Sequence, residues 1–258
     1  MTLCSFIKQS LRYSVFLLLF STFSHADISI SNPGPDLANY PNSAFTLPEG
    51  RAYIEAAPLT YNAPTATSTQ QFNLGYLLRY GFTDDIELRL LSNGFTLQDN
   101  AKITGMSPQV FDVKWHVRDL HNNSYLPAVG IEMSVQSDWA STAFKSGTQP
   151  ALSINFDQIP PYDIAIEYNV GFLTTQNADA NTVYQLALSW AAQRNISDDL
   201  AVFVNGYSNT APDITSSAIG GGMQWTITHR IAVFTNITTG LSSSTPSLFS
   251  LLGFAVAL

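Results

Sequence analysis

The chain has 258 residues, of which only 12% are charged, about half of the ~25% usual in globular proteins. Its formal net charge of −8 argues against nucleic-acid binding, which requires a basic surface. The single cysteine, Cys4, excludes a disulfide framework and a cysteine-based metal site.

Residues 1–26 have the features of a cleaved signal peptide. Lys8 and Arg12 precede an apolar run at 15–20, and residues 24–26, Ser-His-Ala, place small residues at −3 and −1 of a cleavage site. The apolar run is shorter than the ~20 residues of a spanning helix, which disfavours the rival interpretation of an uncleaved anchor. Cleavage would remove Cys4 and leave nine basic and nineteen acidic residues, a formal net charge of −10.

Residues 27–49, called the lead-in below, are predicted to be irregular. Asn-Pro-Gly-Pro at 32–35 and Tyr-Pro-Asn at 40–42 are turn and breaker signals without a sustained period. We expect the lead-in to be periplasmic, where it would lie at the mouth of the following domain or partly plug it.

Residues 50–258 alternate apolar and polar side chains in short runs, with no helical period. In the first clear run, Phe72, Leu74 and Tyr76 share one face, opposite Asn73 and Gly75. About twelve such runs predict an all-β fold, a single antiparallel transmembrane up-and-down β-barrel with an even strand number. The expected strands lie near residues 51–61, 72–80, 86–90, 112–118, 129–136, 150–156, 164–172, 185–190, 200–207, 216–227, 230–239 and 252–258.

The connections between these runs alternate in length, as they do in barrels whose short turns share the periplasmic rim. Short connections are expected near residues 81–85, 119–125, 157–162, 195–199 and 228–229. Long connections are expected near residues 62–69, 92–109, 137–149, 173–181, 208–215 and 240–246.

Alternation also fits a soluble β-sandwich, but the signal peptide and two other features favour a barrel in the bacterial outer membrane. The last strand ends with Phe254, Val256 and Leu258, which resembles the terminal signal read by the barrel-insertion machinery. Aromatic side chains near strand ends suit an interfacial girdle, namely Tyr61, Tyr80, Trp115, Phe172, Trp190 and Trp225.

A basic side chain facing lipid near the midplane costs roughly 2–4 kcal/mol, so charged positions indicate which face of a strand looks into the lumen. Lys114 and His116 lie in mid-strand and are therefore predicted to face inward. Neither face of 200–207 carries a charge, so its orientation stays open. The predicted lumen face carries Glu55, Arg79, Glu87, Arg89, Asp112, Lys114, His116, Arg118, Glu132 and Glu167.

With these strands in place, the mature chain resembles the outer-membrane β-barrel family of transporters named for the meta pathway of phenol degradation. The resemblance is sharpest over residues 46–90, in Leu-Pro-Glu-Gly-Arg at 47–51 and in Leu-Leu-Arg-Tyr-Gly-Phe-Thr-Asp at 77–84. It continues through Asp-Val-Lys-Trp at 112–115 and the turns at Ile196 and Ile227. The resemblance implies a single barrel with a transport role.

The sequence contains none of the searched nucleophile, zinc or phosphate-loop motifs, so we expect no enzyme, cofactor or metal. The leading hypothesis is a passive channel for small solutes, hydrophobic or aromatic ones included, with outer-membrane lipid as its surroundings. The alternative is a non-transporting outer-membrane barrel that acts as a surface adhesin or structural protein. A secreted sandwich and an outer-membrane enzyme are less favoured. The inward charges fit either a structural ion-pair network or a lining that selects a solute.

Overall fold

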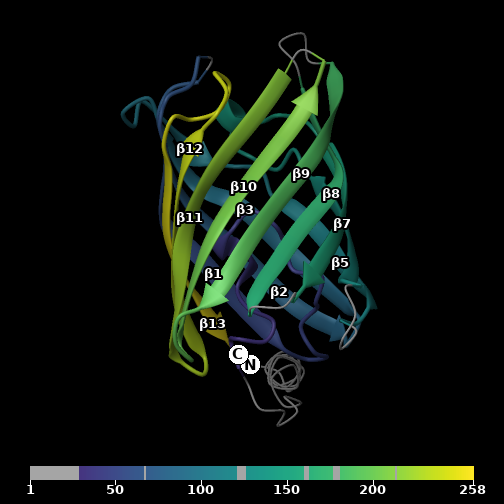
Figure 1. Ribbon diagram of the computed structural model, residues 1–258. Coiled ribbons are helices and arrows are strands. Elements are labelled where there is room, and N and C mark those ends of the chain that lie inside the picture. Colours follow the sequence, from purple (N-terminus) through teal and green to yellow (C-terminus); the bar gives the residue numbers. More distant parts are fainter. Residues whose placement is uncertain (1–28, 67, 121–125, 160–162, 177–180, 213) are drawn as a thin grey trace, which may run out of the picture.

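Figure 1 shows the computed structural model, a barrel of tilted antiparallel strands. The structure describes residues 29–258 except 67, 121–125, 160–162, 177–180 and 213, so the expected signal peptide lies outside it. The described strands are β1 (Ala52–Asn62), β2 (Gln71–Thr83), β3 (Ile86–Gln98), β4 (Ile103–Met106), β5 (Val110–Arg118), β6 (Ala128–Gln136), β7 (Gln149–Gln158), β8 (Ile164–Gln176), β9 (Thr182–Asn195), β10 (Leu200–Ala211), β11 (Ile214–Thr228), β12 (Ile231–Gly240) and β13 (Phe249–Ala257). Two short 3-10 helices are also described, Asp36–Ala38 and Thr142–Phe144.

The sheet closes because β1 pairs with β2 on one side and with β13 on the other. Tyr53 of β1 lies opposite Arg79 of β2 and opposite Ala257 of β13. Among the described strands, β4 pairs only with β3 and stands outside the wall, while the other twelve form it. Closure leaves no unpaired edge, which a strand protein in lipid requires. The predicted twelve-stranded antiparallel barrel is confirmed.

Three long connections predicted from the sequence are shorter in the structure. Instead of 173–181, the connection between β8 and β9 begins only after Gln176. β10 and β11 stay paired as far as Ala211 and Ile214, so most of 208–215 is strand. β3 continues to Gln98, where it pairs with both β2 and β4, so 92–109 is largely strand as well. Polar side chains such as Ser208 made these stretches look like loops. Ladder hydrogen bonds can nevertheless extend a strand where its side chains no longer need to be apolar.

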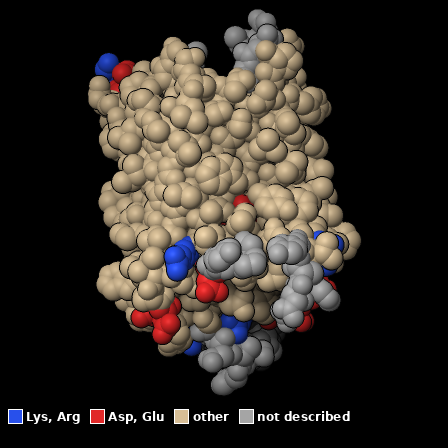
Figure 2. Space-filling model, viewed as in Figure 1, with Lys and Arg blue, Asp and Glu red and all other residues tan. Residues whose placement is uncertain are grey.

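Each strand of the wall turns one face outward and one inward. On β5, Trp115 is 48% exposed whereas Lys114 is 0% exposed. On β10, whose orientation the sequence left open, Val204 faces outward and Asn205 is buried in the interior. Figure 2 shows a broad uncharged belt across the visible face of the barrel, with most visible charges gathered toward the lower end, where the C-terminus lies in Figure 1. An uncharged outer belt is what acyl chains can solvate. In the described part of the chain, no helix is long and apolar enough to cross a bilayer.

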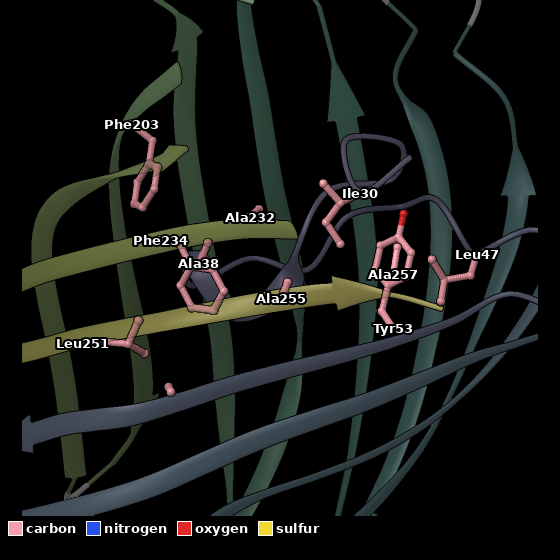
Figure 3. Close-up of a cluster of buried hydrophobic side chains, with 11 residues drawn as sticks. Ile30, Ala38, Leu47, Tyr53, Phe203, Ala232, Phe234, Leu251, Ala255 and Ala257 are labelled. Atoms are coloured by element: carbon pink, nitrogen blue, oxygen red, sulfur yellow. The ribbon is translucent and has the colours of Figure 1, made fainter. Parts of the chain in front are cut away.

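The lead-in runs inside the barrel. Ile30 and Leu47 are fully buried and belong to an apolar cluster with Tyr53 of β1, Phe203 of β10 and Phe234 of β12. Figure 3 shows these side chains converging from the lead-in and from the surrounding strands. The described lead-in, from residue 29 onward, therefore has a packed core of its own within the lumen.

Two glycines of the wall let the lead-in pass close to the strands. A Cβ atom on Gly81 would lie 2.1 Å from the carbonyl oxygen of Pro48, and one on Gly130 would lie 2.7 Å from that of Ala44. Any side chain at either position would collide with the lead-in backbone. The wall of β2 and β6 is thus shaped to receive this segment.

Candidate functional site

A cluster of buried charges occupies the lumen between β1 and β6. Arg79 of β2 donates from Nε to Glu87 Oε1 at 2.7 Å and from Nη1 to Glu55 Oε1 at 3.1 Å. Arg89 of β3 has its Nη1 atom 2.9 Å from Glu132 Oε2 and 3.3 Å from Asp112 Oδ2. These residues come from five strands, β1, β2, β3, β5 and β6, so opposite charges meet at each step around the wall.

The lead-in contributes the central carboxylate of this cluster. Asp36 Oδ2 lies 2.5 Å from Lys114 Nζ, 3.5 Å from Arg79 Nη2 and 3.7 Å from Arg89 Nη2. Burial alone would raise the pKa of Asp36, but the charges of Arg79, Lys114 and Arg89 outweigh this effect and hold the pKa well below its usual range. Removing one member of such a buried pair typically costs about 3–5 kcal/mol. The cluster therefore ties the lead-in to the wall.

Acidic and amide side chains of the wall also bind the lead-in backbone. The N–H groups of Asp36 and Leu37 donate to Glu55 at 3.2 and 2.7 Å, and the N–H of Leu47 donates to Glu87 Oε2 at 2.7 Å. An irregular backbone inside a barrel has no ladder of its own, so each buried N–H group needs a partner of this kind. These inward carboxylates thus stabilise the lead-in as well as the neighbouring cations.

A second set of contacts connects the lead-in to β6, β7 and β8. Asn42 Nδ2 donates to Glu132 at 2.8 Å, and Ser43 Oγ donates to Asp157 Oδ2 at 2.6 Å. Asn39 Nδ2 donates to Glu167 Oε2 at 3.1 Å. On β8, Asn169 accepts from the N–H of Asn42 at 2.7 Å and donates to its carbonyl oxygen at 2.9 Å. These contacts are hydrogen bonds rather than ion pairs.

Tyr40 anchors the lead-in toward β10 and β12. Its hydroxyl lies 2.6 Å from Thr238 Oγ1, and its ring meets Tyr207 edge to face with centroids 4.7 Å apart. Burial raises the pKa of Tyr40 to about 12, so the side chain remains a neutral phenol at physiological pH. The pair of Tyr40 and Tyr207 therefore presents uncharged ring surface to the lumen.

The structure brings seven of the ten predicted lumen residues into the charged cluster and places three elsewhere. The seven are Glu55, Arg79, Glu87, Arg89, Asp112, Lys114 and Glu132. His116 stacks on Phe45 of the lead-in, and its Nδ1 atom lies 3.0 Å from the carbonyl oxygen of Ala44. Glu167 stands apart with Asn39. The side chain of Arg118 is exposed at the rim, where it donates to the carbonyl oxygen of Pro127 at 2.7 Å.

Sequence reasoning missed the lead-in residues Asp36, Asn39 and Asn42 and the wall residues Asp157 and Asn169. For the two wall residues a signal was available, because a spacing of two residues places side chains on the same face of a strand. Asp157 shares its face with Ser153 and Asn155, and Asn169 shares its face with Glu167. The lead-in has no period, so no pattern assigned its polar side chains to a face. In the described part of the chain, no group of three or more His, Cys, Asp or Glu side chains is arranged to hold a metal ion.

Cavities lie on both sides of the lead-in. The long-loop cavity, of about 450 Å³, is near the ends of β10 and β11 that face the long loops, and Tyr40, Asn42, Asn169, Ser189, Tyr207 and Phe249 are among its lining residues. The short-turn cavity, of about 210 Å³, faces the opposite end, and Asn39, Ser43, Asp157, Glu167, Gln193 and Gln224 are among its lining residues. A further space of about 350 Å³ beside β2 and β3 also reaches Tyr40. The lumen is therefore hollow above and below the lead-in.

Comparisons with known proteins agree with this architecture. The family described as "Putative MetA-pathway of phenol degradation" matches residues 36–258. An outer membrane channel from Pseudomonas putida F1 is similar in structure, with a TM-score of 0.62 and 12% sequence identity over 85% of this chain and 99% of that chain. The KdgM porin (TM-score 0.52, 8% identity, 79% and 98% covered) and the NanC porin (0.52, 10%, 80% and 98%) share the fold. No curated protein matches the chain by sequence.

Proposed function

The chain belongs to the family of the MetA-pathway of phenol degradation, and from this membership and the closed barrel we propose that it is an outer-membrane channel for the passive diffusion of small solutes. One observation carries the proposal. Inside a wall with an uncharged outer belt, cavities of about 450 and 210 Å³ open on the two sides of a narrow segment of chain. A barrel whose sole task was structural would have no need of hollow space at both ends of its lumen.

The lead-in serves as a plug that narrows the passage. It is tied to the wall by the Asp36 ion pairs and by backbone hydrogen bonds to Glu55 and Glu87, so it stays in place as part of the pore. A twelve-stranded barrel already encloses less space than a porin of sixteen or more strands. We therefore expect a small conductance and a low size limit for solutes.

The long-loop cavity indicates the kind of solute. Its lining combines the rings of Tyr40, Tyr207 and Phe249 with amides and hydroxyls such as Asn209 and Thr245. Its one carboxylate, Glu132, is paired with Arg89 at 2.9 Å. Rings provide apolar contact area, and the neutral polar groups can orient a hydroxyl or carbonyl group of a guest. The favoured class is small uncharged solutes with an aromatic or apolar part.

We also expect three further properties of this protein. The protein has no catalytic role of its own, since its buried acids and bases are engaged with one another or with the lead-in. Its last strand, which pairs with β1 and β12, would be read by the barrel-insertion machinery through Phe254, Val256 and Leu258. Periplasmic orientation of the short-turn end follows from the usual arrangement of such barrels.

Planar-bilayer recordings of the refolded protein test the channel. We expect small, stable single-channel currents, and larger ones after deletion of residues 29–47. Swelling of proteoliposomes in a graded panel of neutral solutes then gives the size limit. A folded barrel that passes no ion and no solute, with or without the lead-in, would instead support the adhesin or structural alternative. Heat-modified migration on a denaturing gel confirms that each sample is folded.

A further inference from the structure

The lead-in is held far more strongly on one side of the lumen than on the other. All three cations that contact Asp36 come from β2, β3 and β5. On the opposite side, β8 holds the lead-in only through the hydrogen bonds that Asn39 and Asn42 make with Glu167 and Asn169. Single hydrogen bonds contribute about 0.5–1.5 kcal/mol each, so this side opens at much lower cost.

The inward face of the wall carries small side chains on that side. On β9, Ala187, Ser189 and Ala191 alternate toward the lumen, opposite the outward Leu188 and Trp190. On β8, Gly171 follows Asn169 on the same face. Small side chains leave room beside the lead-in, whereas the facing wall is filled by the arginines and the lysine of the charged cluster.

The two cavities approach each other along this strip. The long-loop cavity reaches Asn169 and Ser189, and the short-turn cavity reaches Glu167 and Gln193. Glu167 and Asn169 are two residues apart on one strand face, roughly 7 Å along β8. The side chain of Asn39 and the backbone of Asn42 lie across this short gap, through their hydrogen bonds to Glu167 and Asn169. Ser189 Oγ also donates to Asn169 Oδ1 at 3.2 Å there.

We propose that solutes pass between the lead-in and the β8–β9 wall, and that the Asn39–Glu167 and Asn42–Asn169 hydrogen bonds form the constriction of this route. The inference rests on the proposed channel function. Asn42 lines the long-loop cavity and Asn39 lines the short-turn cavity, so a solute that moves from one cavity to the other along β8 must displace these contacts. The ion-paired side of the lead-in stays fixed and holds the plug in position while a solute passes.

Opening the constriction should raise the conductance. We would compare the full chain with an Asn39→Ala/Asn169→Ala double variant, and with Asn73→Ala as the matched control. Asn73 is also buried and hydrogen-bonded on an inward face, but it lies on β2, away from the gap. We expect at least a twofold larger single-channel conductance for the double variant and no change for Asn73→Ala.

The outcomes separate this route from the channel itself. If deletion of residues 29–47 raises the conductance while the double variant matches the unaltered chain, solutes take another route and the inference fails. If even the deleted form carries no current, the channel function fails. Equal increases in the double variant and in Asn73→Ala would also overturn the route, because they would show general loosening.

Blocking the route after folding gives an independent test. Ser189→Cys would be introduced into the double variant, which also carries Cys4→Ser. The protein would then be treated with a bulky methanethiosulfonate reagent that modifies the new cysteine. Ser92→Cys on β3, introduced in the same way, serves as the control. Ser92 also faces inward but lies near the ion-paired side. Modification at Ser189→Cys should remove at least half of the current, and modification at Ser92→Cys should leave it unchanged. Block at Ser92→Cys alone, or at neither position, contradicts the proposed route.

Discussion

Lys114 Nζ on β5 lies 2.5 Å from Asp36 Oδ2 in the lead-in, and both side chains are almost completely buried. The two residues are 78 positions apart, so this contact joins a short 3-10 helix of the lead-in to the middle of a barrel strand. Asp36 also meets Arg79 and Arg89, which makes it the point where the lead-in enters the charged cluster of the wall. The plug and the barrel are therefore one cooperative unit.

Removing Lys114 should destabilise the barrel strongly. Lys114→Met keeps the length and apolar stem of the side chain but leaves Asp36 with less compensation, so we expect a loss of about 3–5 kcal/mol in the free energy of unfolding. Urea unfolding of the refolded protein in lipid, followed by tryptophan fluorescence, measures this loss. Lys145→Met is the control, because Lys145 pairs with Asp138 at 3.2 Å in a half-exposed position and should cost only about 0–1 kcal/mol. Equal losses in the free energy of unfolding for both variants would contradict a stabilising role of the buried Lys114–Asp36 ion pair.

The stabilising effect of the Asp36 ion pairs should weaken in acid. The pKa of Asp36 is lower in the folded protein than the ordinary ~3.9 of an unfolded chain, so its stabilising effect is fully present above that value. The effect is lost as the pH falls from about 5 toward the folded pKa. Asp36→Asn lacks the charge at every pH. The stability difference between the unaltered chain and Asp36→Asn should therefore shrink as urea unfolding is repeated from pH 7 to pH 3, and a constant difference would show that the carboxylate does not titrate in this way.

The sequence was informative about the wall and uninformative about what fills it. A buried Lys114 beside an outward Trp115 could be predicted, because a charge facing lipid is costly and alternation then fixes its neighbours. β10 carries no charge, so only the structure shows that Asn205 faces inward. Arg118 was assigned to the lumen by alternation, but it lies at the last residue of β5, where the rim allows its side chain to reach Pro127.

The partners of the charged cluster were beyond the reach of pattern analysis. Three cations and four carboxylates of the wall are visible as alternating charges, yet the carboxylate between them, Asp36, comes from an aperiodic segment. Contacts between sequence-distant segments depend on how the lead-in folds back into the lumen. Turn signals such as Pro33 and Pro41 indicate that the chain bends there, but they do not indicate where it goes.

A charge placed on the outer belt should be costly. Val204 is 53% exposed and lies near the middle of β10, so in a water-soluble protein Val204→Arg would have little effect. In a bilayer we expect a loss of roughly 2–4 kcal/mol in the free energy of unfolding. Leu241→Arg provides the control, because Leu241 is 65% exposed in the loop after β12 and should tolerate the charge. Similar small effects at both positions would show that the belt does not face lipid.

The charge of the short-turn cavity should determine which ions pass. Asp157 and Glu167 are among its lining residues, and its lining includes no Lys or Arg. The cations of the lumen lie in the cluster across from it, where carboxylates already compensate them. A narrow path bordered by unopposed carboxylates attracts cations and repels anions. We therefore expect a reversal potential of cation-selective sign in a KCl gradient at alkaline pH, where these buried carboxyl groups are ionised.

Neutralising one of these carboxylates, while keeping its shape, should reduce the cation selectivity at the same alkaline pH. Glu167→Gln retains an acceptor for Asn39 Nδ2, so the constriction keeps its hydrogen bond and only the charge is lost. The reversal potential should move toward zero, with little change in conductance. Asp99→Asn, at an exposed turn beyond β3 where Asp99 pairs with Lys102 at 3.1 Å, should leave the potential unchanged. An anion-selective pore would contradict a route lined by these carboxylates. A shift from Asp99→Asn as large as that from Glu167→Gln would mean that selectivity is set at the long-loop rim, where Asp99 lies.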